Sequence, residues 1–126
     1  MTTDELPVAQ LKAELFKALA HPVRVRALEV LVRGECSVTA LSDQLGIELS
    51  HLSQQLAILR RAQVVVTRRE GNTIFYSLRD PRLSQLFAVA KQMLMSKLED
   101  SRDLLITMAD MDRLEAHSPL GTALSR

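Results

Sequence analysis

The chain has 126 residues, of which 47% are hydrophobic and only 3% aromatic. This is enough for one domain and rarely for two, with a core of aliphatic side chains that favours helices. The net charge is +1, no apolar run approaches the ~20 residues of a membrane span, and the N-terminus lacks the features of a signal peptide. With Cys36 as the single cysteine, these features exclude an internal disulfide and predict a cytoplasmic protein that does not enter the membrane.

The N-terminal part predicts two helices. Residues 1–7 are polar and are expected to be flexible. From Val8 onward, apolar residues follow helical spacing until Pro22, which disfavours helix at His21 and is well placed to begin a second helix. The second helix is expected to end at Gly34. We expect it to turn Val25, Leu28, Leu31 and Val32 inward and Arg24, Arg26 and Arg33 outward.

The middle of the chain predicts two short helices joined by a tight turn. Ser37 can cap a third helix, and Gly46 ends it because glycine adopts the left-handed conformation at low cost. A fourth helix over residues 49–62 places its leucines on one face by their spacing of three, four and three. These leucines are Leu49, Leu52, Leu56 and Leu59.

Strand-forming residues then replace the helical pattern. Residues 64–68 and 73–78 are rich in β-branched and aromatic side chains, and the sequence between them, residues 69–72, is typical of a turn. A two-stranded hairpin is therefore predicted, with basic residues near its tip. The segment 60–79 contains five arginines and one glutamate, which indicates a surface that meets phosphate.

A long last helix is predicted to begin at Asp80 or Pro81. About thirty residues would span ~45 Å, more than the small domain before it could cover. Its apolar stripe should therefore pack against a second chain. Residues 117–126 lose the periodicity and are expected to form a flexible tail. The stripe consists of Leu83, Leu86, Phe87, Ala90, Leu94, Leu98, Leu105, Met108 and Met111.

The fourth helix has the properties of a DNA-recognition helix. Opposite its leucines it presents small polar side chains, and serine and glutamine can bond base edges in the major groove. The arginines at its end and on the hairpin are expected to meet phosphates, which position a protein without specifying sequence. The predicted DNA-binding residues are Ser50, His51, Ser53, Gln54, Gln55, Arg60, Arg61, Arg68 and Arg69.

Three segments together resemble the ArsR/SmtB family of bacterial repressors. They are residues 19–31, residues 52–62 with Gln55 where many members have histidine, and residues 71–78. The resemblance, closest to actinobacterial members, covers residues 11–105. It implies a mainly helical winged helix-turn-helix fold with one hairpin, dimerising through the first and last helices, with residues 8–116 as the DNA-binding and dimerisation domain. It also implies a homodimeric repressor that binds an inverted-repeat operator in double-stranded DNA and releases it when an effector arrives.

The effector is left open by the sequence. Relatives with a Cys-x-Cys metal site would have their thiolates at the positions of Ser37 and Thr39, and Cys36 is out of that register. No metal site and no cofactor is therefore predicted. Cys36 could act as a redox thiol, although a buried structural cysteine is the simpler interpretation. A metal- or thiol-responsive repressor with another effector site, a small organic effector and constitutive binding all remain alternatives.

Two other classes of function fit the sequence less well. An enzyme is not expected, because no catalytic constellation, glycine-rich phosphate loop or cluster of metal ligands is present in the sequence. A winged helix that binds another protein is less consistent with the basic hairpin and the polar recognition face. The operator and the regulated genes cannot be inferred from the chain.

Overall fold

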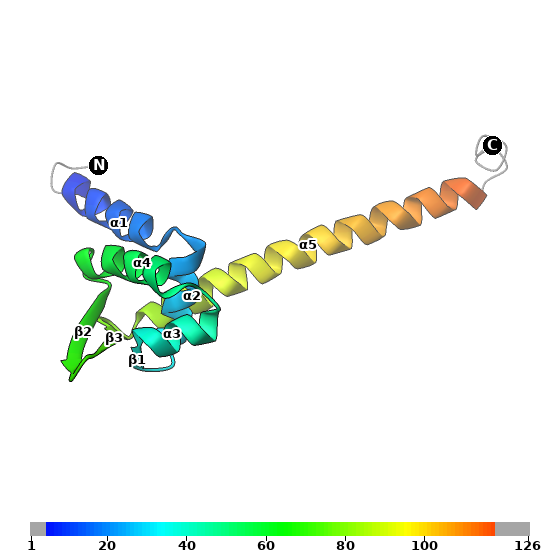
Figure 1. Ribbon diagram of the computed structural model, residues 1–126. Helices are drawn as coiled ribbons and strands as arrows, with labels where there is room; N and C mark the ends of the chain where they lie inside the picture. Colours follow the sequence, from blue (N-terminus) through cyan, green and yellow to red (C-terminus); the bar gives the residue numbers. More distant parts are fainter. Residues whose placement is uncertain (1–4, 118–126) are drawn as a thin grey trace. The chain divides into compact units, whose positions relative to one another are not determined.

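A computed structural model describes residues 5–117, which form five helices, two six-residue strands and one two-residue strand (Figure 1). The chain divides after Gln85 into two units, and α5 begins just before that boundary. The elements are α1 (Glu5–Leu19), α2 (Pro22–Leu31), β1 (Cys36–Ser37), α3 (Val38–Leu45), α4 (Leu49–Arg61), β2 (Val65–Glu70), β3 (Thr73–Leu78) and α5 (Leu83–His117). The order confirms the predicted winged helix-turn-helix, with β1 added.

The expected start of the first helix was three residues late. Glu5, Leu6 and Pro7 already belong to α1, and a proline is tolerated there because the first helical turn has no internal acceptor for its missing N–H. His117, expected in the flexible tail, still belongs to the last helix. The rest of the two segments expected to be flexible, residues 1–4 and 118–126, lies outside the described residues.

The boundary between α1 and α2 follows the predicted chemistry. His21 has extended backbone angles, and its Nδ1 accepts a hydrogen bond of 3.1 Å from the Val23 N–H. Pro22 follows at the start of α2, where its fixed φ suits the helix. His21 is thus the N-cap of α2. In the next helix Ser37 caps α3 in the same way, through the Ala40 N–H at 3.1 Å.

The hairpin differs from the prediction at its turn. Arg69 and Glu70 were expected in a four-residue turn, but they continue β2 and pair with Ile74 and Thr73. The loop is only Gly71-Asn72, and Gly71 has a φ of +61°, at the position where type II′ hairpin turns place glycine. A two-residue loop lets the strands pair to their ends.

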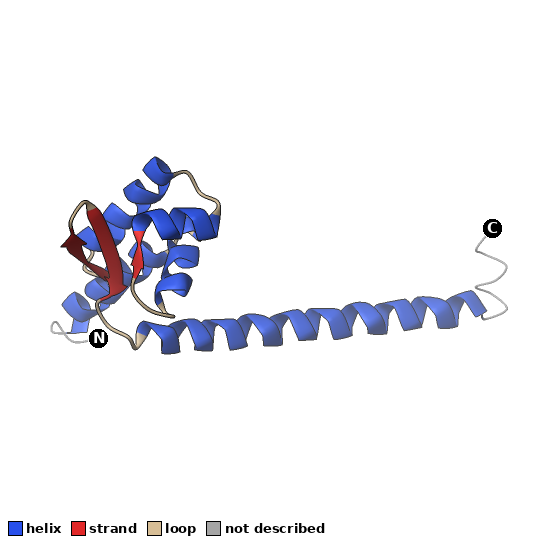
Figure 2. Cartoon of the chain, turned by 60° about the horizontal axis from the view of Figure 1, so that its bottom comes forward, coloured by secondary structure: helices blue, strands red, loops and turns tan. Residues whose placement is uncertain are grey.

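The sheet has a third strand that the sequence did not reveal. β1 pairs with β3, so the antiparallel order is β1-β3-β2 (Figure 2). Cys36 lies opposite Tyr76 and Ser37 opposite Phe75. Two residues contain no detectable period, and the pairing joins segments about forty residues apart in sequence. The strand therefore becomes visible only in three dimensions.

The core of the first unit is aliphatic, as the composition predicted. Its fully buried large side chains come from α2, α3, α4 and β2, so α4 packs on the other helices through its leucine face. Leu49 is an exception to that prediction, because it lies in the first turn of α4 and is 43% exposed. Val32, also expected inside, follows the end of α2 and is exposed. The fully buried residues are Leu28, Leu41, Leu52, Leu56, Leu59 and Val65.

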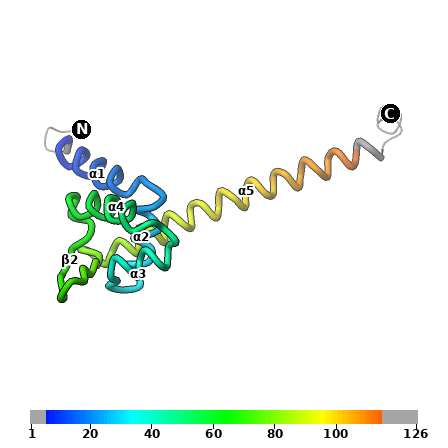
Figure 3. The backbone as a smooth tube through the Cα atoms, in the orientation of Figure 1, coloured from blue at the N-terminus to red at the C-terminus, as the bar shows by residue number. Residues whose placement is uncertain are grey.

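The last helix begins at Leu83, two or three residues later than expected. The Asp80 carboxylate accepts a hydrogen bond from the Arg82 N–H, and the turn before the helix is closed by backbone bonds from Leu83, Ser84 and Gln85. Figure 3 traces α5 as one continuous helix. Its 35 residues are about 52 Å long. From residue 88 to residue 114, every side chain of α5 is exposed, including its leucines and methionines.

Candidate nucleic-acid interface

The turn between α3 and α4 is fixed by a small set of bonds. Gly46 has a φ of +64°, which glycine adopts without steric cost. The Ile47 N–H donates to the Ser42 carbonyl at 3.2 Å, and the Ser42 hydroxyl donates to the Ile47 carbonyl at 2.6 Å. A nitrogen of Arg26 donates to the Leu45 carbonyl at 3.1 Å, at the end of α3 where positive charge is favoured. The angle at which α4 leaves α3 is therefore set by side chains as well as by the glycine.

The face of α4 opposite the core presents the predicted polar residues to solvent. Ser50, His51 and Gln54 are exposed, whereas Ser53 is half-buried at the flank. The amide of Gln54 makes no hydrogen bond with any other described residue, so its donor and acceptor are both free within residues 5–117. That combination matches the bidentate contact that glutamine makes with adenine.

Gln55 has a different environment from Gln54. Its Oε1 accepts a hydrogen bond of 2.8 Å from the guanidinium of Arg24. The same guanidinium donates to the Ala18 carbonyl at 2.7 Å, at the last turn of α1. Arg24, expected to point outward, thus joins α1, α2 and α4. Gln55 lies on the core side of the predicted recognition face, and one of its two functional groups is already engaged.

Ser50 also has a hydrogen-bond partner, Glu48, which was not among the predicted site residues. Its hydroxyl donates to Oε1 of Glu48 at 2.7 Å. Glu48 is the N-cap position of α4, with φ −55° and ψ 136°, yet its side chain makes no capping bond. The signal in the sequence was an acidic residue directly before a helix that otherwise presents neutral polar groups.

The C-terminal end of α4 is closed by a Schellman motif. The Val64 N–H donates to the Leu59 carbonyl at 2.9 Å and the Gln63 N–H to the Arg60 carbonyl at 3.0 Å. This motif requires a left-handed residue, and Gln63 fills the position with a φ of +61°. It is the one non-glycine residue with positive φ in the described part of the chain. The motif turns the chain from α4 into β2.

Three of the predicted arginines line one hollow. Arg60 comes from the last turn of α4, while Arg68 and Arg69 come from β2. Thr67 and Ile74 complete the lining. Arg61 is exposed beside Arg60. A concave surface with several guanidinium groups suits a phosphate, because guanidinium forms charge-assisted bonds with phosphate oxygens.

Arg68 is the most constrained of these arginines. Its Nε lies 2.9 Å from both carboxylate oxygens of Glu35, and Nη2 lies 2.7 Å from one of them. Nη1 donates to Glu70 at 2.9 Å, and the guanidinium stacks over the Phe75 ring at 4.4 Å. Hydrogen bonding to Arg68 lowers the pKa of Glu35 below its ordinary value. The hydrogen bonds that Arg68 donates to Glu35 and Glu70 raise the pKa of Arg68 above its ordinary value. The side chain joins the hairpin of β2 and β3, which is the wing of this fold, to the segment before β1.

Cys36 lies beside this tie. Its Sγ accepts a weak hydrogen bond of 3.7 Å from the amide of Gln44, and the residue is half-buried in β1. It lines a shallow hollow with Arg33, Glu35 and Gln44. Within residues 5–117, no three histidine, cysteine, aspartate or glutamate side chains are close enough together to hold a metal ion.

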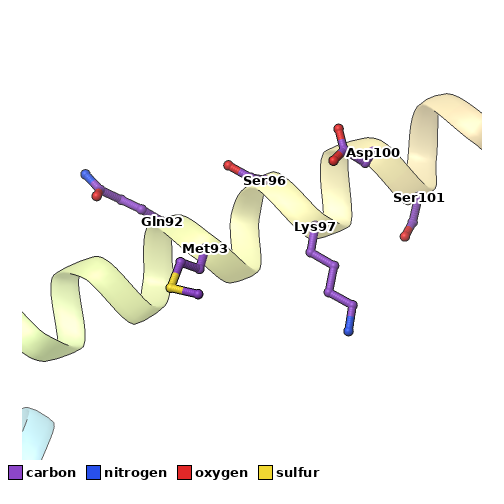
Figure 4. A pocket seen from close by; sticks show the side chains of 6 residues that line it. All are labelled: Gln92, Met93, Ser96, Lys97, Asp100 and Ser101. Carbon is purple, nitrogen blue, oxygen red and sulfur yellow. The ribbon is translucent and has the colours of Figure 1, made fainter. Parts of the chain in front are cut away.

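A third surface depression lies along α5 alone. Gln92, Ser96 and Asp100 form one row of side chains, and Met93, Lys97 and Ser101 form the next (Figure 4). All six residues belong to α5. None of the helices in the described part of the chain combines the length and hydropathy needed to cross a bilayer.

Comparison with known proteins places these features in a family. The sequence profile described as "Bacterial regulatory protein, arsR family" matches residues 21–66. The HTH-type transcriptional regulator Rv0081 of Mycobacterium tuberculosis is 52% identical over 95 residues, which are 75% of this chain and 83% of that protein. Its crystal structure aligns with a TM-score of 0.68, covering 75% of this chain and 96% of that one.

Two further structures share the fold. The transcriptional repressor BigR of Xylella fastidiosa is 40% identical, with a TM-score of 0.65 over 74% of this chain and 96% of its own. A homodimeric winged helix-turn-helix DNA-binding domain from Mycobacterium bovis is 28% identical, with a TM-score of 0.70 over 79% of this chain and 93% of that one.

Proposed function

This chain belongs to the ArsR family of bacterial regulatory proteins, and from that premise we propose that it represses transcription by binding an inverted-repeat operator as a homodimer. The homodimer is supported by the assembly of the Mycobacterium bovis domain, and repression by the name of BigR. Such a protein acts on DNA in the cytoplasm by binding alone and requires no catalysis.

The observation on which the proposal chiefly depends is the pairing of a polar helix face with an arginine-lined hollow. In helix-turn-helix proteins the recognition helix enters the major groove and phosphate contacts fix its register. Here Gln54 is free on the exposed face of α4. At the other end of the same helix, Arg60 shares a hollow with Arg69 of the wing. A single DNA duplex could therefore contact the exposed face of α4 with its bases and the arginine-lined hollow with its phosphates.

The proposed roles follow from the environment of each side chain. Gln54 and His51 contact base edges, with Ser50 and Ser53 at their sides. Arg60, Arg61 and Arg69 contact phosphates. Arg68 stays in the proposed interface with a supporting role, because Glu35 and Glu70 already occupy its donors and it holds the wing in place. Gln55 likewise supports α4 through Arg24.

Dimerisation is proposed to use α1 and α5. Both helices expose apolar side chains that a lone chain would leave in water: Leu11 is 64% exposed on α1, and Leu98 and Leu105 are 60% and 66% exposed on α5. Exposed apolar surface of this kind marks an association surface. We take residues 8–116 as the DNA-binding and dimerisation domain.

The test is a binding measurement on the promoter of the chain's own gene. Fluorescence anisotropy with that fragment and a scrambled fragment of equal length should show preferential binding, with an affinity that falls steeply with salt because several phosphates are contacted. Sedimentation of the complex should give two chains per site. Equal affinity for both fragments at every salt concentration would contradict the proposal.

The same binding assay can identify the effector. Zn(II), Ni(II), Cu(I), an oxidant and a polysulfide are each added to the complex. A ligand that binds the folded protein raises its melting temperature, and an effector also releases the DNA. The Cys36→Ser variant separates effects at the thiol from those of metal binding elsewhere.

A further inference from the structure

The N-terminal end of α4 presents a carboxylate where a DNA-binding surface would be expected to avoid one. Glu48 is exposed and forms no ion pair with any other residue among 5–117. Its side chain does not cap the helix. Neither a capping bond nor an ion pair therefore occupies this carboxylate, and its charge at the start of α4 faces solvent.

Ser50 fixes that carboxylate. Its hydroxyl donates to Oε1 of Glu48 at 2.7 Å, which uses the only proton that serine can give. Oε2 of Glu48 has no described partner. The pair therefore presents acceptors only: one carboxylate oxygen from Glu48 and the lone pairs of the Ser50 hydroxyl.

An acceptor-only group in a major groove has few partners. Phosphate oxygens repel it, and guanine N7 and O6 and thymine O4 are acceptors too. The exocyclic amino groups of cytosine and adenine are the donors in that groove, and carboxylates typically accept from cytosine N4. In helix-turn-helix proteins the N-terminal residues of the recognition helix are those that reach base edges.

We propose that Glu48, oriented by Ser50, is a specificity-determining residue that accepts a hydrogen bond from the N4 amino group of a cytosine in each operator half-site. The inference rests on the proposed function, because it needs α4 to enter the major groove. Ser50 is a positioning residue in this arrangement. Gln54, one turn further along α4, contacts a separate base.

The experiment is selection of bound sequences from random double-stranded DNA by the full-length protein and its variants. The wild type should enrich an inverted repeat with a cytosine at one position of each half-site. Glu48→Ala should lose about tenfold in preference at that position only, with the other positions unchanged. Glu48→Gln should shift the same position toward adenine, because glutamine both donates to N7 and accepts from N6.

Three further variants complete the experiment. Asp43→Asn removes the same charge from the exposed surface of α3 and should tighten binding to all sequences without changing the preferred bases. Ser50→Ala should weaken the cytosine preference only in part, and Ser50→Thr should restore it. Circular dichroism confirms that each variant is folded.

The outcomes separate this inference from the proposed function. If the wild type enriches no sequence, sequence-specific binding itself is overturned and the inference with it. If the wild type enriches a repeat and Glu48→Ala enriches the same bases with the same preferences, the inference alone is overturned.

Discussion

Both carboxylate oxygens of Glu35 accept hydrogen bonds from the Arg68 guanidinium, although the two residues are 33 positions apart in sequence. The bond joins the segment after α2 to the middle of the wing. Arg68 also reaches Glu70 on its own strand and stacks on Phe75 of the neighbouring strand. Contacts of Arg68 with the rest of the domain therefore fix the orientation of the wing, which leaves Arg69 as the other arginine on β2.

This pairing predicts a pH dependence of stability. The pKa of Glu35 is lowered in the folded protein, so the ionised form is favoured by folding. Its contribution is fully present above the ordinary glutamate pKa of 4.5 and is lost as the pH falls through the lowered value. The melting temperature of the wild type should exceed that of Glu35→Gln at pH 7, and the difference should vanish in strong acid. A difference that is constant over this range would refute the assignment.

The two wing arginines should differ in DNA binding. Arg69→Ala should weaken operator and random DNA about equally and lower the slope of log affinity against log salt by about one phosphate contact per subunit. Arg68→Ala should change that slope less, since Glu35 and Glu70 already neutralise its charge. Anisotropy titrations at several salt concentrations give both slopes. Equal slopes for the two variants would mean that Arg68 leaves Glu35 for phosphate.

The helices of this fold were predictable because each has a local period and a local end signal. The leucine spacing of α4, the cap at Ser37 and the glycine at 46 are all contained within a few residues of sequence. The strand β1 and the Glu35–Arg68 bond were not predictable in this way. They arise from contacts between distant segments, and nothing in either segment alone distinguishes them from solvated surface.

The candidate site divides in the same manner. The exposed face of α4 follows from helical geometry, so the free position of Gln54 was foreseeable. Whether a polar side chain on that helix is free or engaged depends on a partner. Gln55 and Ser50 were grouped with Gln54, but Arg24 and Glu48 occupy them. Glu48 was not predictable as part of the site, because an acidic residue at a helix start commonly caps the helix, whereas this side chain makes no capping bond.

The end of α4 offers a stabilising substitution. Gln63 has a left-handed backbone, a conformation that costs a residue with a side chain roughly 1–2 kcal/mol. Gln63→Gly should stabilise the protein by about 0.5–1 kcal/mol, the gain being reduced because glycine also makes the unfolded chain more flexible. Urea unfolding at one protein concentration measures the change. The control is Ala62→Gly, at a position with φ −79°, which should destabilise the protein. If both variants were more stable than the wild type, the gain at Gln63 would not come from relief of backbone strain.

The apolar stripe of α5 should be needed for assembly. Leu98→Asp places a charge on a face that we expect to be buried between two chains, so it should shift the sedimentation coefficient toward the monomer and weaken operator binding. Gln92→Asp introduces the same charge at an exposed polar position of α5 and should leave the dimer intact. A Leu98→Asp protein that stays dimeric at micromolar concentration would place the interface elsewhere.

Gln54 provides the most direct test of base recognition. Its amide is free on the exposed face of α4, so Gln54→Ala removes a base contact without breaking any described contact within the domain. Affinity for the operator should fall by about 1–3 kcal/mol, the range for a bidentate contact, while affinity for random DNA stays nearly constant. Gln55→Ala is the matched neighbour: it breaks the bond to Arg24, so it should lower the melting temperature more than Gln54→Ala does. Anisotropy on both DNAs, with melting curves, separates the two effects. An equal loss on operator and random DNA for Gln54→Ala would exclude a role for this glutamine in recognising sequence.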